Sequence, residues 1–163
     1  MTSRRKFPEM ALTGLVAGLI GGWAMSQFSF LWNRLPRSRP NLIPYSPQEW
    51  DTTKNVAQFA ARRLLRRPLS ERDQRAGAAL VHYGTAAVAG LVYATALSAP
   101  LRAKNWSGPL YGLAVWAVGN EVLMPALGFE KQPAQYTPSM QAQAVGEHLV
   151  YGLTLQLLCG RYV

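Results

Sequence analysis

Two long stretches of the chain contain no Asp, Glu, Lys or Arg. They run from Met10 to Asn33 and from Ala76 to Leu101. A helix in a soluble bundle carries polar residues along one face, whereas a helix that crosses a lipid bilayer needs about 20 predominantly apolar residues. The pattern therefore predicts two membrane-spanning helices, over about 10–32 and 76–97.

Two shorter apolar segments predict two further spans, over about 108–124 and 144–159. Thr137-Pro138 can open the last helix ahead of its apolar part, because Thr is favoured as an N-cap and Pro at the first helical position. Pro125 lacks the N–H that would bond the carbonyl of Glu121, so we expect the third helix to kink or stop there.

The segment between the first two spans is basic and contains several prolines, which end continuous helix. Ser46-Pro47-Gln48-Glu49 then has the form of a helix start with a capping box. An apolar face and a group of arginines predict an amphipathic helix over about 47–67 that lies on the membrane surface; the alternative is a solvated loop helix. These residues are Val56, Phe59, Ala60 and Leu64 on the face, and Arg62, Arg63, Arg66 and Arg67 near the end.

The expected fold is therefore all-α. A single membrane domain over 1–163 contains a bundle of four transmembrane helices, with an amphipathic interfacial helix between the first and the second. Ser70 supplies a new N-cap ahead of the second span. With four spans, the excess of basic residues in the first and third loops favours an orientation with both termini outside the cytoplasm.

Charge and composition exclude several function classes. The formal net charge is +9, and ten of the 17 basic residues lie between Arg34 and Arg75, beside apolar segments, so lipid headgroups explain them better than nucleic acid does. One cysteine and two histidines cannot form an intrachain disulfide or, without carboxylates, a four-ligand zinc site. No catalytic constellation is present, and we expect no enzyme activity and no cofactor.

Small residues recur at helical spacing in the first two spans. Gly14, Gly18 and Gly22 follow one another at intervals of four, and Ala86 and Gly90 do the same in the second span. Faces of small residues let helix backbones approach closely in a membrane. We expect these residues to pack helix against helix.

Polar and ionisable residues within the spans are the candidates for function. They are His82, Asn120, Glu121, Glu147 and His148. In an antiparallel bundle, Glu121 and Glu147 should lie at one membrane level and His82 in the opposite half. A proton or cation relay is one interpretation, interhelical hydrogen bonding is the other, and haem held by His82 and His148 is a third, weakened because the two lie at different depths.

Several short motifs resemble the YagU-like inner-membrane proteins, a bacterial family of unknown function. They are Leu35-Pro36-Arg37-Ser38, Val81-His82, Tyr93, Met124-Pro125-Ala126-Leu127-Gly128 and Gly146-Glu147-His148-Leu149-Val150-Tyr151. The resemblance implies a multi-pass protein of a bacterial inner membrane with no assigned reaction. Asn120 and Glu147 depart from the family pattern, so a three-histidine cluster is absent.

These observations predict a multi-pass membrane protein without catalysis of its own. Its expected role is that of a structural or accessory component, packed against itself or in a larger membrane complex, with the lipid bilayer as its other partner. The alternative is a small proton- or cation-conducting channel or transporter that uses the intramembrane His and Glu residues.

Overall fold

The computed structural model describes residues 7–35, 51–97, 101 and 104–160. This part of the chain is helical and contains no strand, which confirms the all-α class. In chain order the elements are α1 (Phe7–Arg34), α2 (Thr52–Leu64), α3 (Glu71–Ala96), α5 (Ser107–Trp116), the π-helical segment η1 (Ala117–Leu123), the short α6 (Met124–Ala126), the 3-10 turn η2 (Pro133–Gln135) and α7 (Pro138–Cys159).

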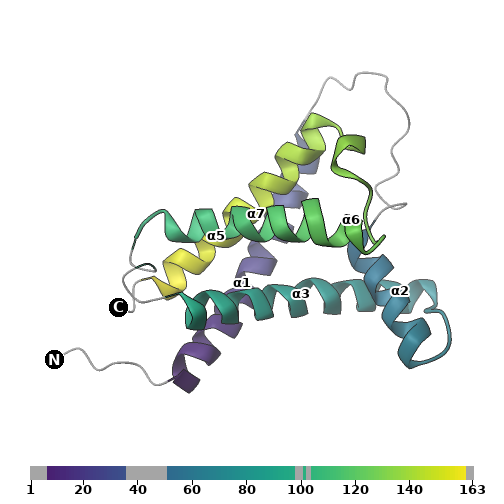
Figure 1. Cartoon of the computed structure of the whole chain (residues 1–163), viewed down its shortest axis with the longest axis horizontal. Coiled ribbons are helices and arrows are strands. Elements are labelled where there is room, and N and C mark those ends of the chain that lie inside the picture. The colour runs from purple at the N-terminus through teal and green to yellow at the C-terminus, as the bar shows by residue number, and fades with distance from the viewer. Residues whose placement is uncertain (1–6, 36–50, 98–100, 102–103, 161–163) are drawn as a thin grey trace.

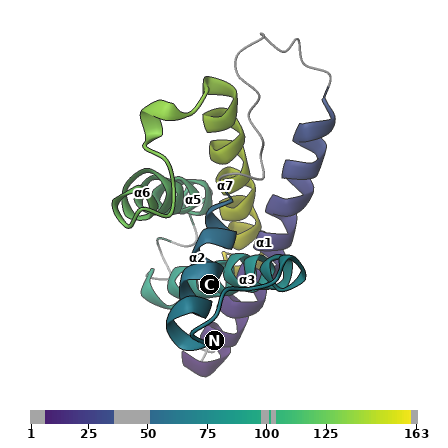
Figure 2. The ribbon, with the colours of Figure 1, turned by 90° about the vertical axis from the view of Figure 1, so that its right-hand side faces the viewer.

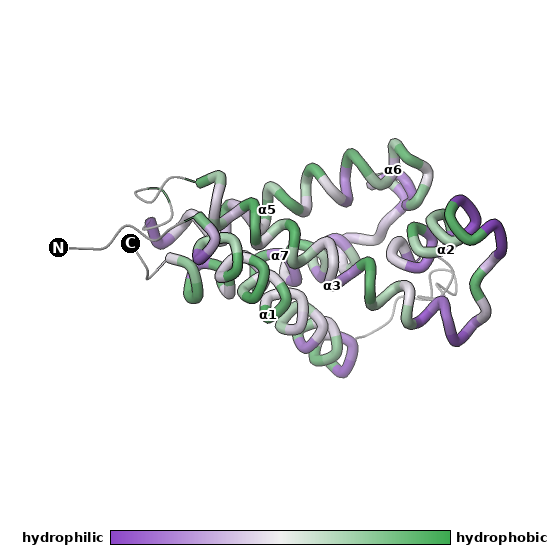
Figure 3. The backbone as a smooth tube through the Cα atoms, turned by 90° about the horizontal axis from the view of Figure 1, so that it is seen from below, coloured by the Kyte–Doolittle hydropathy of each residue, from purple (hydrophilic) through white to green (hydrophobic). Residues whose placement is uncertain are grey.

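The long helices run in two directions, which cross at an oblique angle. α3 and the α5–α6 rod run side by side along the long axis, while α1 and α7 are inclined to them (Figures 1 and 2). The start of α1, the end of α3, the start of α5 and the end of α7 lie towards one end of the molecule. α2 and its hydrophilic turn lie at the opposite end (Figure 3).

Two helices, α1 and α3, are long and apolar enough to cross a membrane. Both correspond to the long uncharged stretches of the sequence. α5, η1 and α6 follow one another without a break from residue 107 to residue 126, and α7 extends over 22 residues. The predicted span 108–124 is therefore one helical rod, and the predicted span 144–159 is the later part of a longer helix.

The helix starts are fixed by side-chain caps. The Ser70 side chain accepts a hydrogen bond from the backbone N–H of Asp73 and caps α3, and Thr137 caps α7 through the N–H of Met140, as the sequence predicts. In the described part of the chain α2 begins at Thr52 and ends at Leu64, and residues 47–50 of the predicted helix lie outside the described residues. Asp51 has extended backbone angles and accepts from the N–H of Lys54, which makes it the N-cap; the expected capping box at Ser46 lies outside the described residues.

The third helix ends one residue after Pro125, which agrees with the expectation that it kinks or stops there. The helix widens into the π-helical segment η1 before the proline, and the N–H of Met124 bonds the carbonyl of Gly119, five residues back. A π turn changes the hydrogen-bond register by one residue, which accommodates the missing N–H of Pro125. It ends after Ala126, and Gly128 follows with a φ of +74°.

Glycines and alanines form the contact between α1 and α3. A Cβ atom added to Gly14 would lie 2.6 Å from the carbonyl oxygen of Gly90 and 2.7 Å from the Cβ of Ala94. At Gly18 it would collide with the backbone of Ala86. The residues expected to pack helices thus lie at the crossing of the first two long helices.

The second pair of helices crosses in the same manner. Cβ atoms added to Gly108 or Gly112 would collide with the carbonyl oxygens of Gly152 or His148 on α7. α1 contacts α7 where an aromatic ring of one helix packs on a glycine of the other. The Phe28 ring lies on Gly146, and the Tyr151 ring lies on Gly21. The interior is therefore built from small residues and a few aromatic rings.

Large apolar side chains are instead found on the outer surface. Examples, with their exposed fractions, are Leu12 63%, Leu31 61%, Leu80 76%, Val88 58%, Leu110 55%, Val122 64% and Leu157 56%. They belong to α1, α3, α5, η1 and α7. A water-soluble domain buries such side chains and rarely exposes a large contiguous apolar surface.

Candidate functional site

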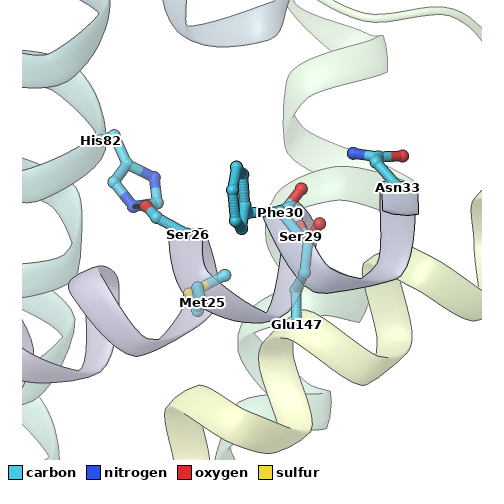
Figure 4. Close-up of a pocket in the computed structure, with 7 residues that line it drawn as sticks. All are labelled: Met25, Ser26, Ser29, Phe30, Asn33, His82 and Glu147. Carbon is cyan, nitrogen blue, oxygen red and sulfur yellow. Dashed lines mark hydrogen bonds between the residues drawn. The ribbon is translucent and has the colours of Figure 1, made fainter. Parts of the chain in front are cut away.

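A polar cavity of about 380 Å³ opens where α1 separates from α3 and α7. α1 contributes most of its lining, α3 contributes His82, and α7 contributes Glu147 (Figure 4). The complete lining is Met25, Ser26, Ser29, Phe30, Asn33, His82 and Glu147. Ser26, Ser29 and Asn33 follow one another at intervals of three and four, so they form one polar stripe on the helix.

His82 reaches from α3 to the backbone of α1. Its Nε2 lies 3.0 Å from the carbonyl oxygen of Gly22 and 3.4 Å from Oγ of Ser26. The Ser26 hydroxyl donates to the same carbonyl at 3.1 Å. Because a carbonyl oxygen only accepts, the contact assigns the proton of the neutral ring to Nε2.

Glu147 is joined to α1 through a glutamine one turn earlier on α7. Nε2 of Gln143 donates to Oγ of Ser29 at 3.0 Å and to Oε1 of Glu147 at 2.9 Å. This bridge fixes the carboxylate beside the serine stripe. Two helices that are far apart in sequence thus present a carboxylate and two hydroxyls to one space.

A second polar cluster lies between α3, α5 and α7. The Tyr93 side chain is fully buried, and its hydroxyl contacts Oγ of Ser107 and Oε1 of Gln156, both at 2.9 Å. The N–H of Gly108 donates to the same Gln156 oxygen at 2.9 Å. The Tyr111 and Tyr151 hydroxyls donate to the carbonyls of Ala89 and Ala86 on α3, at 2.7 and 2.6 Å. All of these groups are used in hydrogen bonds within the protein, which is a structural role.

The structure places the predicted polar residues in a different arrangement from the one that an antiparallel bundle implies. His82 and Glu147 line one cavity, so the expectation that His82 lies in the opposite half from the acids is wrong for Glu147. The reason is the oblique crossing of α3 with α1 and α7, which breaks the relation between position along a helix and depth (Figure 1).

The other candidates lie outside the cavity. His148 is buried, and its Nδ1 lies 2.8 Å from the carbonyl oxygen of Ala144. Asn120 and Glu121 belong to η1. Among the residues that the structure describes, no group of three or more His, Cys, Asp or Glu could hold a metal ion.

Sequence reasoning missed the serine stripe of α1. Ser26, Ser29 and Asn33 are uncharged, and each can lie singly in an apolar helix without cost, so none was a candidate by itself. The sequence does carry a signal, because these three residues share one face. An amphipathic end on an otherwise apolar helix indicates that this end faces a polar environment. Gln143 could not be found in this way, since its role depends on a contact across 114 positions of sequence.

The loop between α6 and α7 docks on α2. Nδ2 of Asn55 donates to the carbonyl of Phe129 at 3.0 Å, and the Phe59 and Phe129 rings meet edge to face at 5.2 Å. The Tyr136 hydroxyl donates to Oε1 of Glu130 at 3.1 Å. Burial raises the pKa of Glu130 above its ordinary value, and repulsion from Glu121 adds to the shift against the hydrogen bond from Tyr136.

A scan against protein-family models finds no match for this chain, and searches of curated proteins and of solved structures find no significant match. The resemblance to the YagU-like proteins therefore stays a prediction.

Proposed function

We propose that the chain is a multi-pass integral membrane protein without catalysis of its own, which acts by packing in a membrane assembly or against a second copy. The observation that carries the proposal is the distribution of side-chain size. Small residues fill the helix crossings, and large apolar residues such as Leu80 and Val122 face outward. This arrangement suits lipid, in which close backbone packing holds helices together and apolar side chains need no burial.

The proposal includes four spanning helices. The α5–α6 rod and α7 carry exposed apolar residues of the same kind as α1 and α3, such as Leu110 and Leu157. Spanning helices tilt by about 0–40° from the membrane normal, so two oblique directions can both cross if the normal lies between them. The alternation of helix ends between the two ends of the molecule supports this topology (Figure 3).

The proposed orientation places α2 in the cytoplasm. Its basic residues and those of the following turn lie at one end of the molecule, and Lys104 lies near the α3–α5 connection at the other end. Short loops rich in Lys and Arg stay on the cytoplasmic side. The termini then lie on the opposite side, and the resemblance to the YagU-like family implies a bacterial inner membrane.

Extraction and topology measurements test this proposal. We expect the protein to stay in the membrane pellet at high pH and high salt, and a reporter that is active only in the cytoplasm to be silent when fused after Val163 and active when fused within the α2–α3 turn. Release into the supernatant would overturn the membrane assignment. The reverse pattern would overturn the orientation alone, and equal activity at both points would overturn the proposed number of spans between them.

The cavity favours a second candidate function, the conduction of protons or cations, because it brings an imidazole and a carboxylate together. Towards the start of α1 the packing is tight, with Ala17 only 1% exposed and the Tyr151 ring against Gly21. A conducting path would need these contacts to open. Flux through liposomes that contain the purified protein, abolished by Glu147→Gln, would establish conduction; flux equal to that of empty vesicles would refute it.

A further inference from the structure

We propose that the cavity between α1, α3 and α7 binds a primary ammonium group, with the Glu147 carboxylate as its counter-ion and the His82 ring and the α1 serines as acceptors. The site is defined by its lining residues, which include no Lys or Arg. Within the described part of the chain, no Lys or Arg forms an ion pair with the Glu147 carboxylate. The lining therefore favours a positively charged occupant.

Four groups of the lining can accept a further hydrogen bond, namely His82, Ser26, Ser29 and Glu147, while Asn33 also carries N–H donors and Ser29 keeps its own O–H. The carbonyl of Gly22 takes the Nε2 proton of His82, which leaves Nδ1 of the neutral ring as an acceptor. Figure 4 shows this edge of the ring turned towards Phe30 and the cavity. The Ser26 hydroxyl already donates its proton to Gly22, so its oxygen offers only lone pairs.

The same holds at the other wall. Gln143 donates both to Ser29 and to Glu147, and each of these oxygens retains a lone pair for a further donor. A ligand that fits must bring several N–H donors and a positive charge. A primary ammonium supplies three donors on one atom, whereas a quaternary ammonium of similar charge supplies none.

The apolar part of the lining suits a short carbon chain next to the charge. Met25 and Phe30 contribute apolar surface to the same lining. Both a free alkylamine and the headgroup of an ethanolamine phospholipid carry this chemistry.

Arg34 offers a way to tell these two sources apart. Its guanidinium lies 4.0 Å from the centre of the Phe30 ring, at the end of α1. A phospholipid would bring a phosphate within reach of such a group, and Arg binds phosphate strongly. A free amine carries no anion, so a nearby arginine cannot assist its binding.

Calorimetric titration of the full-length protein in an uncharged detergent tests the ammonium site directly. The probes are ethanolamine hydrochloride and tetramethylammonium chloride. We expect ethanolamine to bind at least about tenfold more tightly than tetramethylammonium, because charge-assisted hydrogen bonds are lost in the latter. Glu147→Gln should weaken ethanolamine binding about tenfold or more, and the matched variant Glu121→Gln, outside the cavity, should leave it unchanged.

The lipid arm uses nanodiscs with ethanolamine or choline phospholipids, and native mass spectrometry of the released protein. Retention of the ethanolamine lipid that depends on both Glu147 and Arg34 identifies the headgroup as the source. Binding of free ethanolamine without retention of the ethanolamine lipid identifies a soluble amine. Ser29→Ala provides a second cavity variant if Glu147→Gln does not fold.

Three results would overturn the proposal: no binding in either arm, equal affinity for ethanolamine and tetramethylammonium, or unchanged affinity in both cavity variants. The titration in detergent does not depend on whether the chain spans a membrane. Its failure is therefore distinguishable from failure of the proposed function, which the extraction measurement decides.

Discussion

Gly18→Ala is expected to destabilise the protein through the crossing of α1 and α3. The added Cβ would collide with the carbonyl oxygen of Ala86 and would lie 2.9 Å from the Cα of Ala87. Both atoms belong to the backbone of α3, so no side chain can rotate away. The two helices have to separate for the methyl group to fit.

The cost follows from the contacts that separation weakens. A radial gap of about 0.5–1 Å forfeits roughly a quarter to a half of the attraction between two atoms, which is about 0.1–0.2 kcal/mol per pair. A few tens of atom pairs across the crossing then lose about 2 kcal/mol in total. This value lies within the range of about 1–3 kcal/mol found for overpacked sites.

Gly84→Ala is the matched control. Gly84 belongs to α3, the other helix of this crossing, but a Cβ atom there has no neighbour within 4 Å. Replacing a helical glycine in open space removes chain entropy from the unfolded state, so this variant should be neutral or about 0.5–1 kcal/mol more stable.

The assay is reversible unfolding in mixed micelles with increasing denaturant, followed by circular dichroism. Gly18→Ala should unfold at a lower denaturant concentration than the natural chain, and Gly84→Ala at the same or a higher one. If both variants unfold together with the natural chain, the close crossing does not exist in the folded protein and the packing argument is refuted.

Three further predictions use the same unfolding measurement. Tyr93→Phe should cost about 1 kcal/mol, because it removes one hydroxyl from the buried contact with Gln156 while the ring stays packed; no change would show that the hydroxyl is not buried there. Thr137→Ala should cost about 1 kcal/mol through loss of the α7 N-cap, and Thr137→Ser should restore most of it. The raised pKa of Glu130 means that the folded state favours the protonated form, so its contribution to stability is present below the unfolded value and is lost as the pH rises through the folded value. Glu130→Gln should therefore be more stable than the natural chain at about pH 7 and no more stable at about pH 4, and the opposite order would refute the assignment.

Much of the helix layout could be predicted from local patterns. The two uncharged stretches correctly predicted the positions of α1 and α3. The N-caps at Ser70 and Thr137 could also be predicted, because a cap depends only on the residues next to it. The start of α2 could not be predicted equally well, because Ser46 and Asp51 are both good N-caps. The sequence contains two valid start signals, and contacts of Asn55 with Phe129 and of Gln58 with Leu69 stabilise the helix that begins after Asp51.

The cavity depended on information that local patterns do not carry. The depth of a residue in a helical bundle follows from its position along the helix only if the helix axes are parallel or antiparallel. That assumption led to the expectation that His82 and Glu147 lie apart. The glycine spacing predicted close helix packing but neither which helices meet nor their angle. The crossing angle determines which side chains lie close together where the helices diverge.

The close crossing and the open cavity have a common cause. α1 touches α3 where its residues are glycine and alanine, from Gly14 to Gly22, and two straight rods that cross obliquely must diverge on either side of their contact. The serine stripe begins directly after this contact, at Ser26, and His82 spans the opening gap to the Gly22 carbonyl. A variant that pushes the helices apart at Gly18 should lengthen that hydrogen bond and release the imidazole. Weaker ethanolamine binding in Gly18→Ala, a residue outside the cavity lining, would therefore show that the crossing positions the site.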